Sequence, residues 1–237
     1  MKKIIISDFD DTIYINGKIA IKTVELVHQF RSAGNLFIIA SGSSYPSLID
    51  KIKDSKLEYD YLICDHGCNI VKNNQLIFSE VIDPVIIKEL IAYYKLDQRD
   101  NVFAVSKDKG VVSLNHDCIS KLQIPFSITG DDFKAKQYMK EKYGDKINCY
   151  CIMHNNAVEV ISGKASKLKA IDKIIDTEKL NSYEIYTIGD GYSDIEMVQK
   201  YHGYCVENAV EDLKQVSKKV YSSFPEFLSE VVTYKII

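Results

Sequence analysis

The chain has 237 residues, of which 46% are hydrophobic, enough for one large core or for a core and a smaller domain. Its net charge is only -3 and its lysines are dispersed, so no basic face for nucleic acid and no polybasic cluster for anionic lipid is present. No signal peptide or membrane span is recognisable. We expect a soluble, cytoplasmic protein that acts on a small molecule, and the oligomeric state stays open.

Near the N-terminus, two carboxylates follow an apolar run. Residues 3–7 (Lys-Ile-Ile-Ile-Ser) are typical of a buried parallel strand, and Asp8 and Asp10 come directly after it. Open α/β sheets bind ligands in the crevice at this edge. Taken alone, residues 8–12 could equally be a polar turn, because Asp and Thr are common turn residues. Three further stretches of matching chemistry favour a functional site.

After this strand, helical and extended patterns alternate in the order that builds a parallel sheet covered by helices. The next strand ends at Ser41 and Gly42, and the third ends at Asp65-His66-Gly67. The expected elements of this part are helices at 21–31 and around 48–52 and strands at 36–40 and 61–64.

From residue 80 to residue 161 the order changes to a helix followed by a hairpin, twice. Asp83-Pro84 is a typical helix start. Two such units cannot join a parallel sheet without breaking its pattern, so residues 80–161 are predicted to form an inserted α+β cap domain with an antiparallel sheet. The expected elements are helices at 85–94 and 133–143, hairpins at 102–114 and 147–161 with turns at 107–110 and 154–156, and a loop through Pro125 and Gly130.

Alternation resumes after the cap. A helix at 165–175 and a strand at 184–188 lead into Gly189-Asp190, with Asp194 four residues later. The predicted fold class is therefore α/β, a Rossmann-like parallel-sheet core in two parts, residues 1–79 and 162–237, with the cap between them.

Several carboxylates are expected at one edge of this sheet, where they repel by about 4 kcal/mol per pair at 4 Å and an effective dielectric constant near 20. A divalent cation resolves this repulsion. Oxygen ligands such as Asp8, Asp190 and Asp194 suit Mg²⁺. Hydroxyl groups, backbone N–H groups and a lysine at the same edge would hold a phosphoryl group.

Four short motifs carry a family resemblance. Asp8-Phe9-Asp10-Asp11-Thr12, Ser41, Lys164, and Gly189-Asp190 with Asp194 resemble, in order and spacing, the four motifs of the haloacid dehalogenase (HAD) superfamily of phosphotransferases. The stretch 189–197 with Val-Glu-Asn-Ala at 206–209 looks like the Cof-type sugar-phosphatase branch, whose type IIB cap lies between the second and third motifs. The resemblance covers nearly the whole chain.

This resemblance implies a reaction and a role for each motif residue. Asp8 would attack phosphorus to form an aspartyl-phosphate, and Asp10 would act first as acid and then as base. Thr12 would support the loop. The residues implied for Mg²⁺ are Asp8, Asp10 through its carbonyl, Asp190 and Asp194, and those implied for substrate binding are Thr12, Ser41, Gly42 and Lys164.

Three positions depart from the usual pattern of this branch. Ser193 stands where Asn is usual, Ala165 where Gly is usual, and Asp65-His66-Gly67 where Asn-Gly is more common. These changes bear on substrate and rate more than on reaction class. His66 could reach the crevice, although a structural role is favoured for it.

The first functional hypothesis is an Mg²⁺-dependent phosphatase of a small phosphorylated metabolite, in first place a sugar phosphate. A phosphosugar mutase resembling phosphomannomutase is the first alternative, but it would need arginine in the cap to grip a second phosphate, and the cap has only Arg99. A protein that binds a phosphometabolite without turning it over is the second alternative. A pure binder gains nothing from Asp10 as a proton shuttle.

Overall fold

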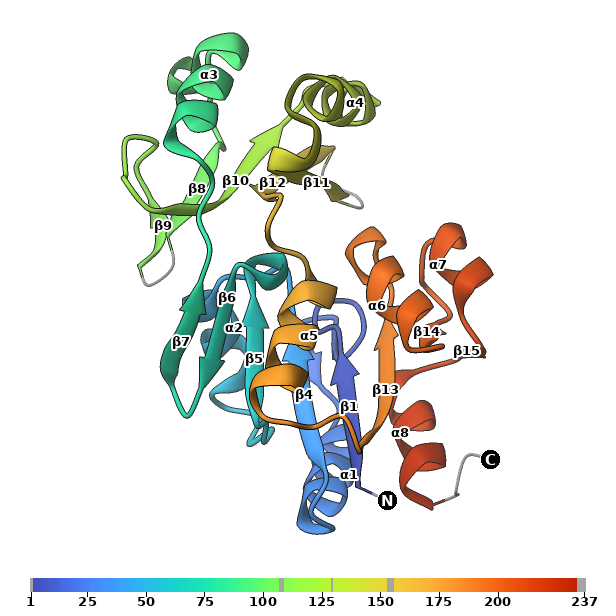
Figure 1. The fold of residues 1–237 in the computed structure, drawn as a ribbon. Coiled ribbons are helices and arrows are strands. Elements are labelled where there is room, and N and C mark those ends of the chain that lie inside the picture. The colour runs from blue at the N-terminus through green and yellow to red at the C-terminus, as the bar shows by residue number, and fades with distance from the viewer. Residues whose placement is uncertain (1, 107–108, 129, 153–155, 234–237) are drawn as a thin grey trace.

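The structure is a computed structural model that describes residues 2–106, 109–128, 130–152 and 156–233. Its strands form two separate large sheets, one above the other in Figure 1, and a two-stranded hairpin of β2 (Tyr14–Ile15) and β3 (Lys18–Ile19). The chain passes from the lower body to the upper one after β7 and returns before α5 (Figure 1). The two bodies are therefore joined by two connections.

The lower body is built on an eight-stranded sheet whose first six strands are parallel. The last two strands run antiparallel to their neighbours at one edge. In sheet order the strands are β15 (Val220–Tyr221), β14 (Tyr204–Val206), β13 (Glu184–Gly189), β1 (Lys3–Ser7), β4 (Leu36–Ala40), β5 (Tyr61–Cys64), β6 (Asn69–Lys72) and β7 (Gln75–Ser79).

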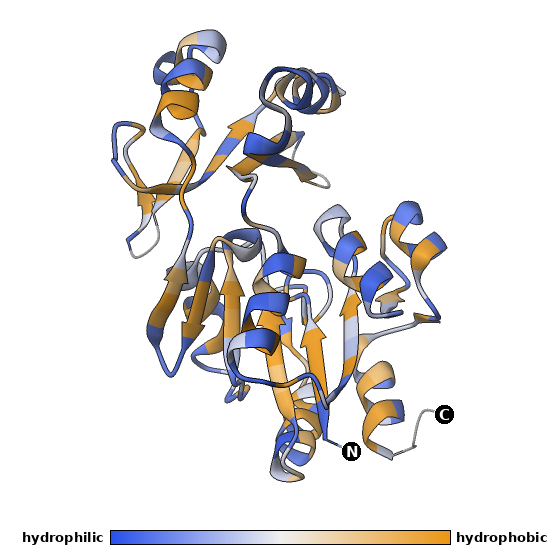
Figure 2. Cartoon of the chain, in the orientation of Figure 1, coloured by the Kyte–Doolittle hydropathy of each residue, from blue (hydrophilic) through white to orange (hydrophobic). Residues whose placement is uncertain are grey.

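Helices cover both faces of this sheet, which explains why its strands are apolar on both sides (Figure 2). Ile5 of β1 packs in a cluster with α1, α2 and α8, whereas Ile4 and Ile6 pack on the opposite face with α5, α6 and α7. The helices are α1 (Ile21–Ser32), α2 (Tyr45–Ile52), α5 (Lys167–Thr177), α6 (Ile195–Lys200), α7 (Glu211–Val216) and α8 (Phe224–Thr233), with the short 3-10 helices η1 (Asp65–Gly67) and η4 (Tyr192–Asp194).

The α/β class and the parallel arrangement expected from the alternating pattern are confirmed. The antiparallel edge formed by β6 and β7 was not predicted. These strands are joined by Asn73 and Asn74, both in the left-handed region with φ of 50° and 59°. Asn tolerates this conformation, and two such residues make the tight turn that a hairpin needs.

The upper body contains an antiparallel sheet with α3 and α4 packed on one side of it (Figure 1). Both expected hairpins are present, β8 with β9 and β11 with β12, although parts of their turns, 107–108 and 153–155, lie outside the described residues. The elements are α3 (Pro84–Tyr94), η2 (Leu96–Gln98), β8 (Phe103–Ser106), β9 (Gly110–Val112), β10 (Ile119–Pro125), α4 (Asp131–Tyr143), η3 (Gly144–Lys146), β11 (Ile147–Ile152) and β12 (Ala157–Ser162), in sheet order β11-β12-β10-β8-β9.

The expected loop through Pro125 is wrong, because residues 119–125 form β10, the central strand of the upper sheet. Pro125 cannot donate a ladder hydrogen bond, but it stands at the last position of the strand, paired in register with Ala157. A proline at a strand end is compatible with pairing. The strand joins the two hairpins into one sheet.

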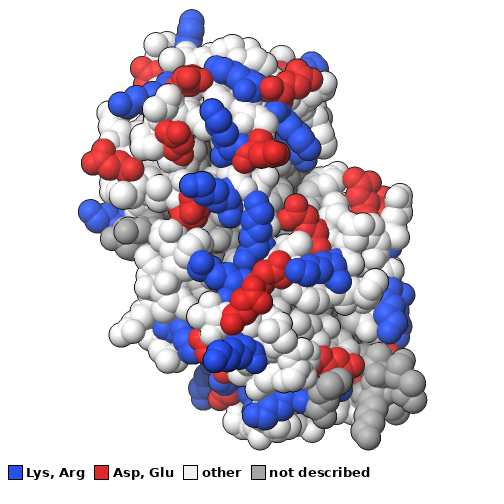
Figure 3. Space-filling view, viewed as in Figure 1, with Lys and Arg blue, Asp and Glu red and all other residues white. Residues whose placement is uncertain are grey.

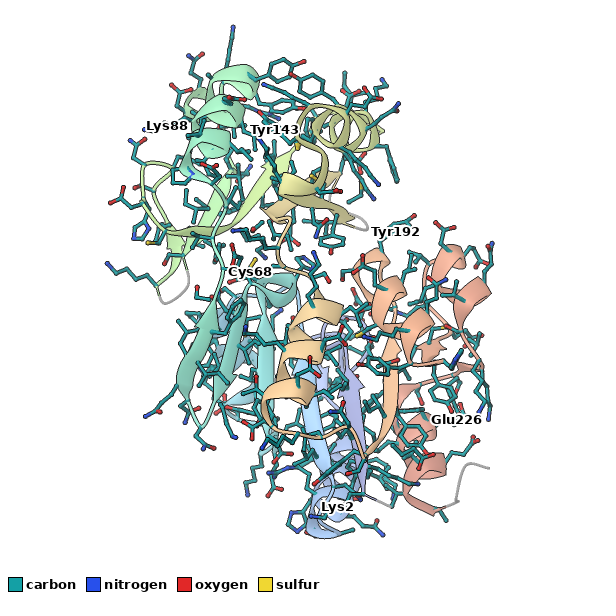
Figure 4. All side chains as sticks on the ribbon, viewed as in Figure 1. Lys2, Cys68, Lys88, Tyr143, Tyr192 and Glu226 are labelled. Atoms are coloured by element: carbon teal, nitrogen blue, oxygen red, sulfur yellow. The ribbon has the colours of Figure 1, made fainter. Side chains whose placement is uncertain are left out.

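We propose that residues 80–161 fold as a domain of their own, inserted between the parts 1–79 and 162–237. The two sheets share no strand, and the buried core of the upper body draws only on residues between Ile82 and Val160. A smaller cluster of Cys68, Ile161 and Ala165 lies where the bodies meet, and Figure 4 shows Cys68 at this junction. Ala165 is thus a packing residue here.

The distribution of charge and the character of the helices complete the description of the fold. Positive and negative side chains are interspersed on the face drawn in Figure 3, without a basic field. Among the described helices, none combines the length and the apolar character that crossing a membrane requires.

Candidate active site

The site begins at the carboxyl end of β1. The backbone N–H of Asp8 donates to the carbonyl of Ile188 at 2.9 Å, which ties the first loop to neighbouring β13. Because β1 and β13 are parallel neighbours, the loops that follow them meet at the same edge of the sheet. Asp8 and Asp190 come together in this way from opposite ends of the chain.

Three carboxylates and one lysine, here named the acidic floor, meet at this edge: Asp8, Asp190, Asp194 and Lys167. One carboxylate oxygen from each aspartate lies within 4.8 Å of the others. The Nζ of Lys167 donates to Oδ1 of Asp8 at 2.5 Å and to Oδ1 of Asp194 at 2.7 Å. All four side chains are buried, so three carboxylates face a single ammonium group.

Burial and mutual repulsion shift the pKa values of the acidic floor. Burial, with the charges of Asp194 and Asp190, raises the pKa of Asp8 well above its usual range against the opposing effect of Lys167. Burial and the charge of Asp194 raise the pKa of Asp190 to about 6. Burial alone would lower the pKa of Lys167, but the carboxylates of Asp194 and Asp8 raise it. The floor holds more negative charge than its lysine can balance.

The lysine at this position is Lys167 and not the expected Lys164. Lys164 is exposed in the turn before α5, where its backbone N–H donates to Ser162 Oγ at 3.3 Å. The reason is local: Ser166 accepts a hydrogen bond from the backbone N–H of Lys169 at 3.2 Å and caps the helix, so α5 begins at Lys167. The first turn of α5 therefore directs Lys167, which is only 1% exposed, into the site.

The Asp190 loop is shaped by its two glycines and by Asp194. The Oδ2 of Asp194 accepts the backbone N–H groups of Asp190 at 3.2 Å and Gly191 at 3.0 Å. A Cβ on Gly189 would lie 2.4 Å from Cγ of Asp194, so only glycine fits. Both oxygens of Asp194 thus have protein partners, and this residue orients the loop as well as contributing charge.

Thr12 differs from its expected substrate-binding role. Its Oγ1 donates to Oδ1 of Asp190 at 2.6 Å, and the side chain is buried. It is not among the residues that line the cavity over Asp8 and Asp190. Thr12 therefore positions Asp190, which agrees with the supporting role that the resemblance implied.

Asp10 is held on the other side of the loop by two residues that the sequence did not single out. Its Oδ1 accepts from Nζ of Lys51 on α2 at 2.5 Å, and its Oδ2 accepts from Ser43 Oγ at 2.8 Å. Ser41 is fully buried; its Oγ accepts the N–H of Ser43 at 2.9 Å and approaches Asp10 Oδ2 at 3.4 Å. Lys51 lies in the last turn of α2, a helix with no recognisable motif, so no sequence signal pointed to it.

A cavity of about 460 Å³ lies over these groups. Both bodies of the molecule line it, and Tyr192, labelled in Figure 4, stands on the lower body where it faces the upper one. Gly42 and Ser193 line it as well, whereas Ser41 and Lys164 do not. From the upper body come Phe103, Val105, Val111, Lys121, Gln123, Tyr150, Cys151, Ile152 and Glu159.

His66 also lines the cavity, against the structural role favoured from the sequence. It sits in η1, where Asp65, His66 and Gly67 all have positive φ, of 49°, 54° and 102°. A Cβ on Gly67 would lie 2.1 Å from the carbonyl oxygen of Ser166, and a Cβ on Gly42 would lie 2.5 Å from the His66 ring. This strained turn therefore needs Gly67 itself, and a glycine at position 42, to bring the imidazole against the loop at Gly42.

Comparison with known proteins agrees with this geometry. The sequence profile of the haloacid dehalogenase-like hydrolases matches residues 5–130 and 119–226. The chain is 25% identical to YkrA of Bacillus subtilis, provisionally named a phosphatase, over 91% of this chain and 90% of that protein. It is also 25% identical to a phosphoglycolate phosphatase of Sulfolobus acidocaldarius, over 100% and 99% of the two chains.

A solved structure supports the fold. The subclass IIB sugar phosphatase BT4131 superposes with a TM-score of 0.78 at 18% identity, covering 95% of both chains. At this identity the likeness concerns the fold alone. Because the family profile spans most of the chain, the chain belongs to the haloacid dehalogenase-like hydrolases.

Proposed function

We propose that the protein is an Mg²⁺-dependent phosphatase that hydrolyses a small phosphorylated metabolite through an aspartyl-phosphate. The observation that carries the proposal is the position of Asp8: a buried carboxylate in a cavity, oriented by Lys167 at 2.5 Å and next to two further carboxylates. Such a carboxylate is a usable nucleophile towards phosphorus once its charge is balanced.

The acidic floor fits a magnesium ion. Its three aspartates offer oxygen donors only. Burial and mutual repulsion raise the pKa of Asp8 and of Asp190, and a bound cation would relieve that repulsion. Asp8, Asp190 and the carbonyl of Asp10 would hold the ion, with Asp194 ligating directly or through water. When bound, Mg²⁺ would neutralise charge on the phosphoryl oxygens.

The chain's own groups can then divide the reaction between them. A carboxylate oxygen of Asp8 attacks phosphorus, the bond to the ester oxygen breaks, and Asp10 gives its proton to the leaving alcohol. Water then attacks the aspartyl-phosphate and passes a proton to Asp10, which releases phosphate and restores both aspartates. Lys167 and the backbone at Gly42 stabilise the transferring group.

The cavity favours a small substrate, and we propose a sugar phosphate. A volume of about 460 Å³ accommodates a monosaccharide phosphate, and aromatic and polar side chains from both bodies surround it. BT4131, which shares this fold, is named a sugar phosphatase, and this also favours a sugar phosphate as substrate. The phosphoglycolate phosphatase among the relatives makes a smaller, acidic substrate the natural competitor in a screen.

Neither alternative function gains support from the site. The cap arginine that a mutase would use, Arg99, donates to the carbonyl of Pro125 and packs on Phe126. It does not line the cavity, and Lys121 is the one described cap cation that does. A pure binding protein would not need Asp10 to be held beside the acidic floor.

The test is phosphate release from p-nitrophenyl phosphate and a panel of sugar, polyol and nucleotide monophosphates, with Mg²⁺ and with chelator. We expect turnover that requires Mg²⁺ and is lost in Asp8→Asn, while circular dichroism shows an unchanged fold. Turnover by Asp8→Asn, or wild-type turnover in chelator, would rule out the proposed chemistry. Isomerisation of a hexose phosphate without phosphate release would favour the mutase.

A further inference from the structure

Opposite the acidic floor, three side chains outside the catalytic set meet in the same cavity. Lys121 comes from β10 and Glu159 from β12, while His66 comes from η1 of the lower body. Their exposed fractions are 6%, 8% and 7%, so all three are nearly buried although they line a cavity. We name these three residues the roof cluster.

The roof cluster is internally paired. The Nζ of Lys121 lies 2.6 Å from Oε1 of Glu159 and donates to the carbonyl of Gly42 at 2.5 Å. The Nε2 of His66 lies 2.5 Å from Oε2 of Glu159. Burial alone would raise the pKa of Glu159, yet Lys121 and His66 lower it to about 2. Glu159 is therefore ionised and accepts from both neighbours.

The cluster still has hydrogen-bonding capacity for a ligand. Each carboxylate oxygen of Glu159 has a second lone pair. Burial lowers the pKa of His66, whose Nε2 faces Glu159. Its Nδ1 is buried and has no hydrogen-bond partner among the described residues. The free lone pairs of Glu159 are acceptors, and a hydroxyl group of a ligand can donate to them.

The charges of the cluster also decide what it cannot accept. The single described cap cation in the cavity, Lys121, is already neutralised by Glu159, and Asp65 lies 4.0 Å behind it. A leaving group that carried a carboxylate or a second phosphate would meet an ionised Glu159 whose cation among the described cap residues, Lys121, is already paired. Like charges brought together in a buried site disfavour binding.

We infer that the roof cluster is the subsite that reads the leaving group, admitting uncharged alcohols with donor hydroxyls and rejecting anionic ones. This inference rests on the proposed phosphatase function and adds to it the sign of the selection and the residues that impose it. Glu159 is the residue on which discrimination depends. Lys121 keeps Glu159 ionised and in place, and His66 fixes its second oxygen.

The first test needs no variant. Glycerol phosphate and phosphoglycerate share a carbon skeleton and differ by a hydroxymethyl group in place of a carboxylate. We expect wild-type kcat/KM to favour glycerol phosphate by at least about tenfold, the order of discrimination that one misplaced charge produces. Equal values, or a preference for phosphoglycerate, would overturn the inference while leaving phosphatase activity established.

The second test removes the negative charge of Glu159 from the roof cluster. Glu159→Gln keeps the shape and removes the negative charge next to Lys121, so the preference ratio should fall by at least about tenfold, mainly through a gain for phosphoglycerate. Glu141→Gln on the exposed face of α4 is the matched control, and its ratio should equal that of the wild type. If Glu159→Gln folds and its ratio stays within about twofold, the roof cluster is structural and the inference fails.

Failure of the proposed function has a different signature. In that case wild-type protein releases no phosphate from p-nitrophenyl phosphate or from either glycerol-based ester, and both proposals fall together. If Glu159→Gln does not fold, the wild-type ratio alone still decides the inference.

Discussion

The floor and the roof of the cavity are both buried groups of charge, but only the roof is balanced. In the floor, three carboxylates share one lysine, and the pKa of Asp190 rises to about 6. In the roof, Lys121 and Glu159 neutralise one another, and the pKa of Glu159 falls to about 2. Burial acts alike on both, so the presence of a matching partner accounts for the opposite shifts.

The difference in charge balance suits the floor and the roof to different tasks. An unbalanced group stores unfavourable charge that a cation and a phosphoryl transfer can relieve, which suits catalysis. A balanced group costs little to keep and discriminates against any ligand that disturbs it, which suits selection. Changes to either group should therefore have different consequences, the greatest where the only cation of the floor is removed.

Lys167→Met removes the only cation of the floor. The reaction should slow by about a hundred- to a thousandfold, because Asp8 loses its orienting partner and the transferring group loses a positive charge. Steady-state turnover of p-nitrophenyl phosphate measures this.

Lys164→Met is the matched control for Lys167→Met. Lys164 is exposed and lies outside the cavity, so turnover should stay within about twofold of the wild type. The opposite result, with Lys164→Met inactive and Lys167→Met active, would restore the expectation drawn from the motif order.

Lys121→Met removes one partner of the balanced roof. Glu159 and Asp65 are then buried without their cation, and the free energy of unfolding should fall by about 3–5 kcal/mol. Urea denaturation followed by circular dichroism measures the change. Lys88→Met, on the exposed side of α3, should cost less than about 0.5 kcal/mol.

Mg²⁺ should stabilise the folded protein more at pH 7.5 than at pH 5. The pKa of Asp190 is raised from 3.8 to about 6, so without a cation its contribution to stability is full below about pH 4 and is lost as the pH rises through 6. The ion binds the ionised form. At about ten times its Kd, it should raise the melting temperature by roughly 3–6 °C at pH 7.5.

Thermal melts with Mg²⁺ and with chelator at both pH values check this dependence. Asp190→Asn removes both the titrating group and a ligand, and should abolish most of the difference. An equal shift at pH 5 and pH 7.5 would place the ion away from the acidic floor.

Lys51→Met should have the smallest effect. The ion pair with Asp10 is partly exposed, with side-chain exposures of 27% and 39%, so it contributes less than about 1 kcal/mol to stability. Asp10 would lose its contact with Lys51 and keep those with Ser43 and Ser41, and kcat should fall by about three- to tenfold. Lys53→Met, whose partner is the exposed Asp50, serves as control. An unchanged kcat in Lys51→Met would mean that the two serines suffice to position Asp10.

Much of the fold and half of the site could be predicted from local pattern. Apolar runs ending in Asp8 and Asp190 predict parallel strands, and the carboxyl ends of such strands share one edge. The structure brings these residues together as expected. The hairpin of β6 and β7 was missed because its apolar pattern is short, although Asn73-Asn74 was an available turn signal.

The choice of lysine could not be made from motif order. Lys164 and Lys167 are both consistent with a basic residue shortly after the cap, and only two residues lie between them in the sequence. Recognition of Ser166 as the helix cap would have selected Lys167, because the residue after a cap starts the first turn. No motif in the sequence points to the roof cluster, since Lys121 and Glu159 are ordinary polar residues within strands.

Local sequence patterns predict the alternation of strands and helices, the change of order at residue 80, and the aspartates at strand ends, because each depends on periodicity or on adjacent residues. Long-range packing sets which lysine faces Asp8, that Lys51 holds Asp10, and that His66 and Lys121 both contact Glu159. These contacts join residues far apart in the chain. Their partners are set by how the two sheets pack, which no local pattern encodes.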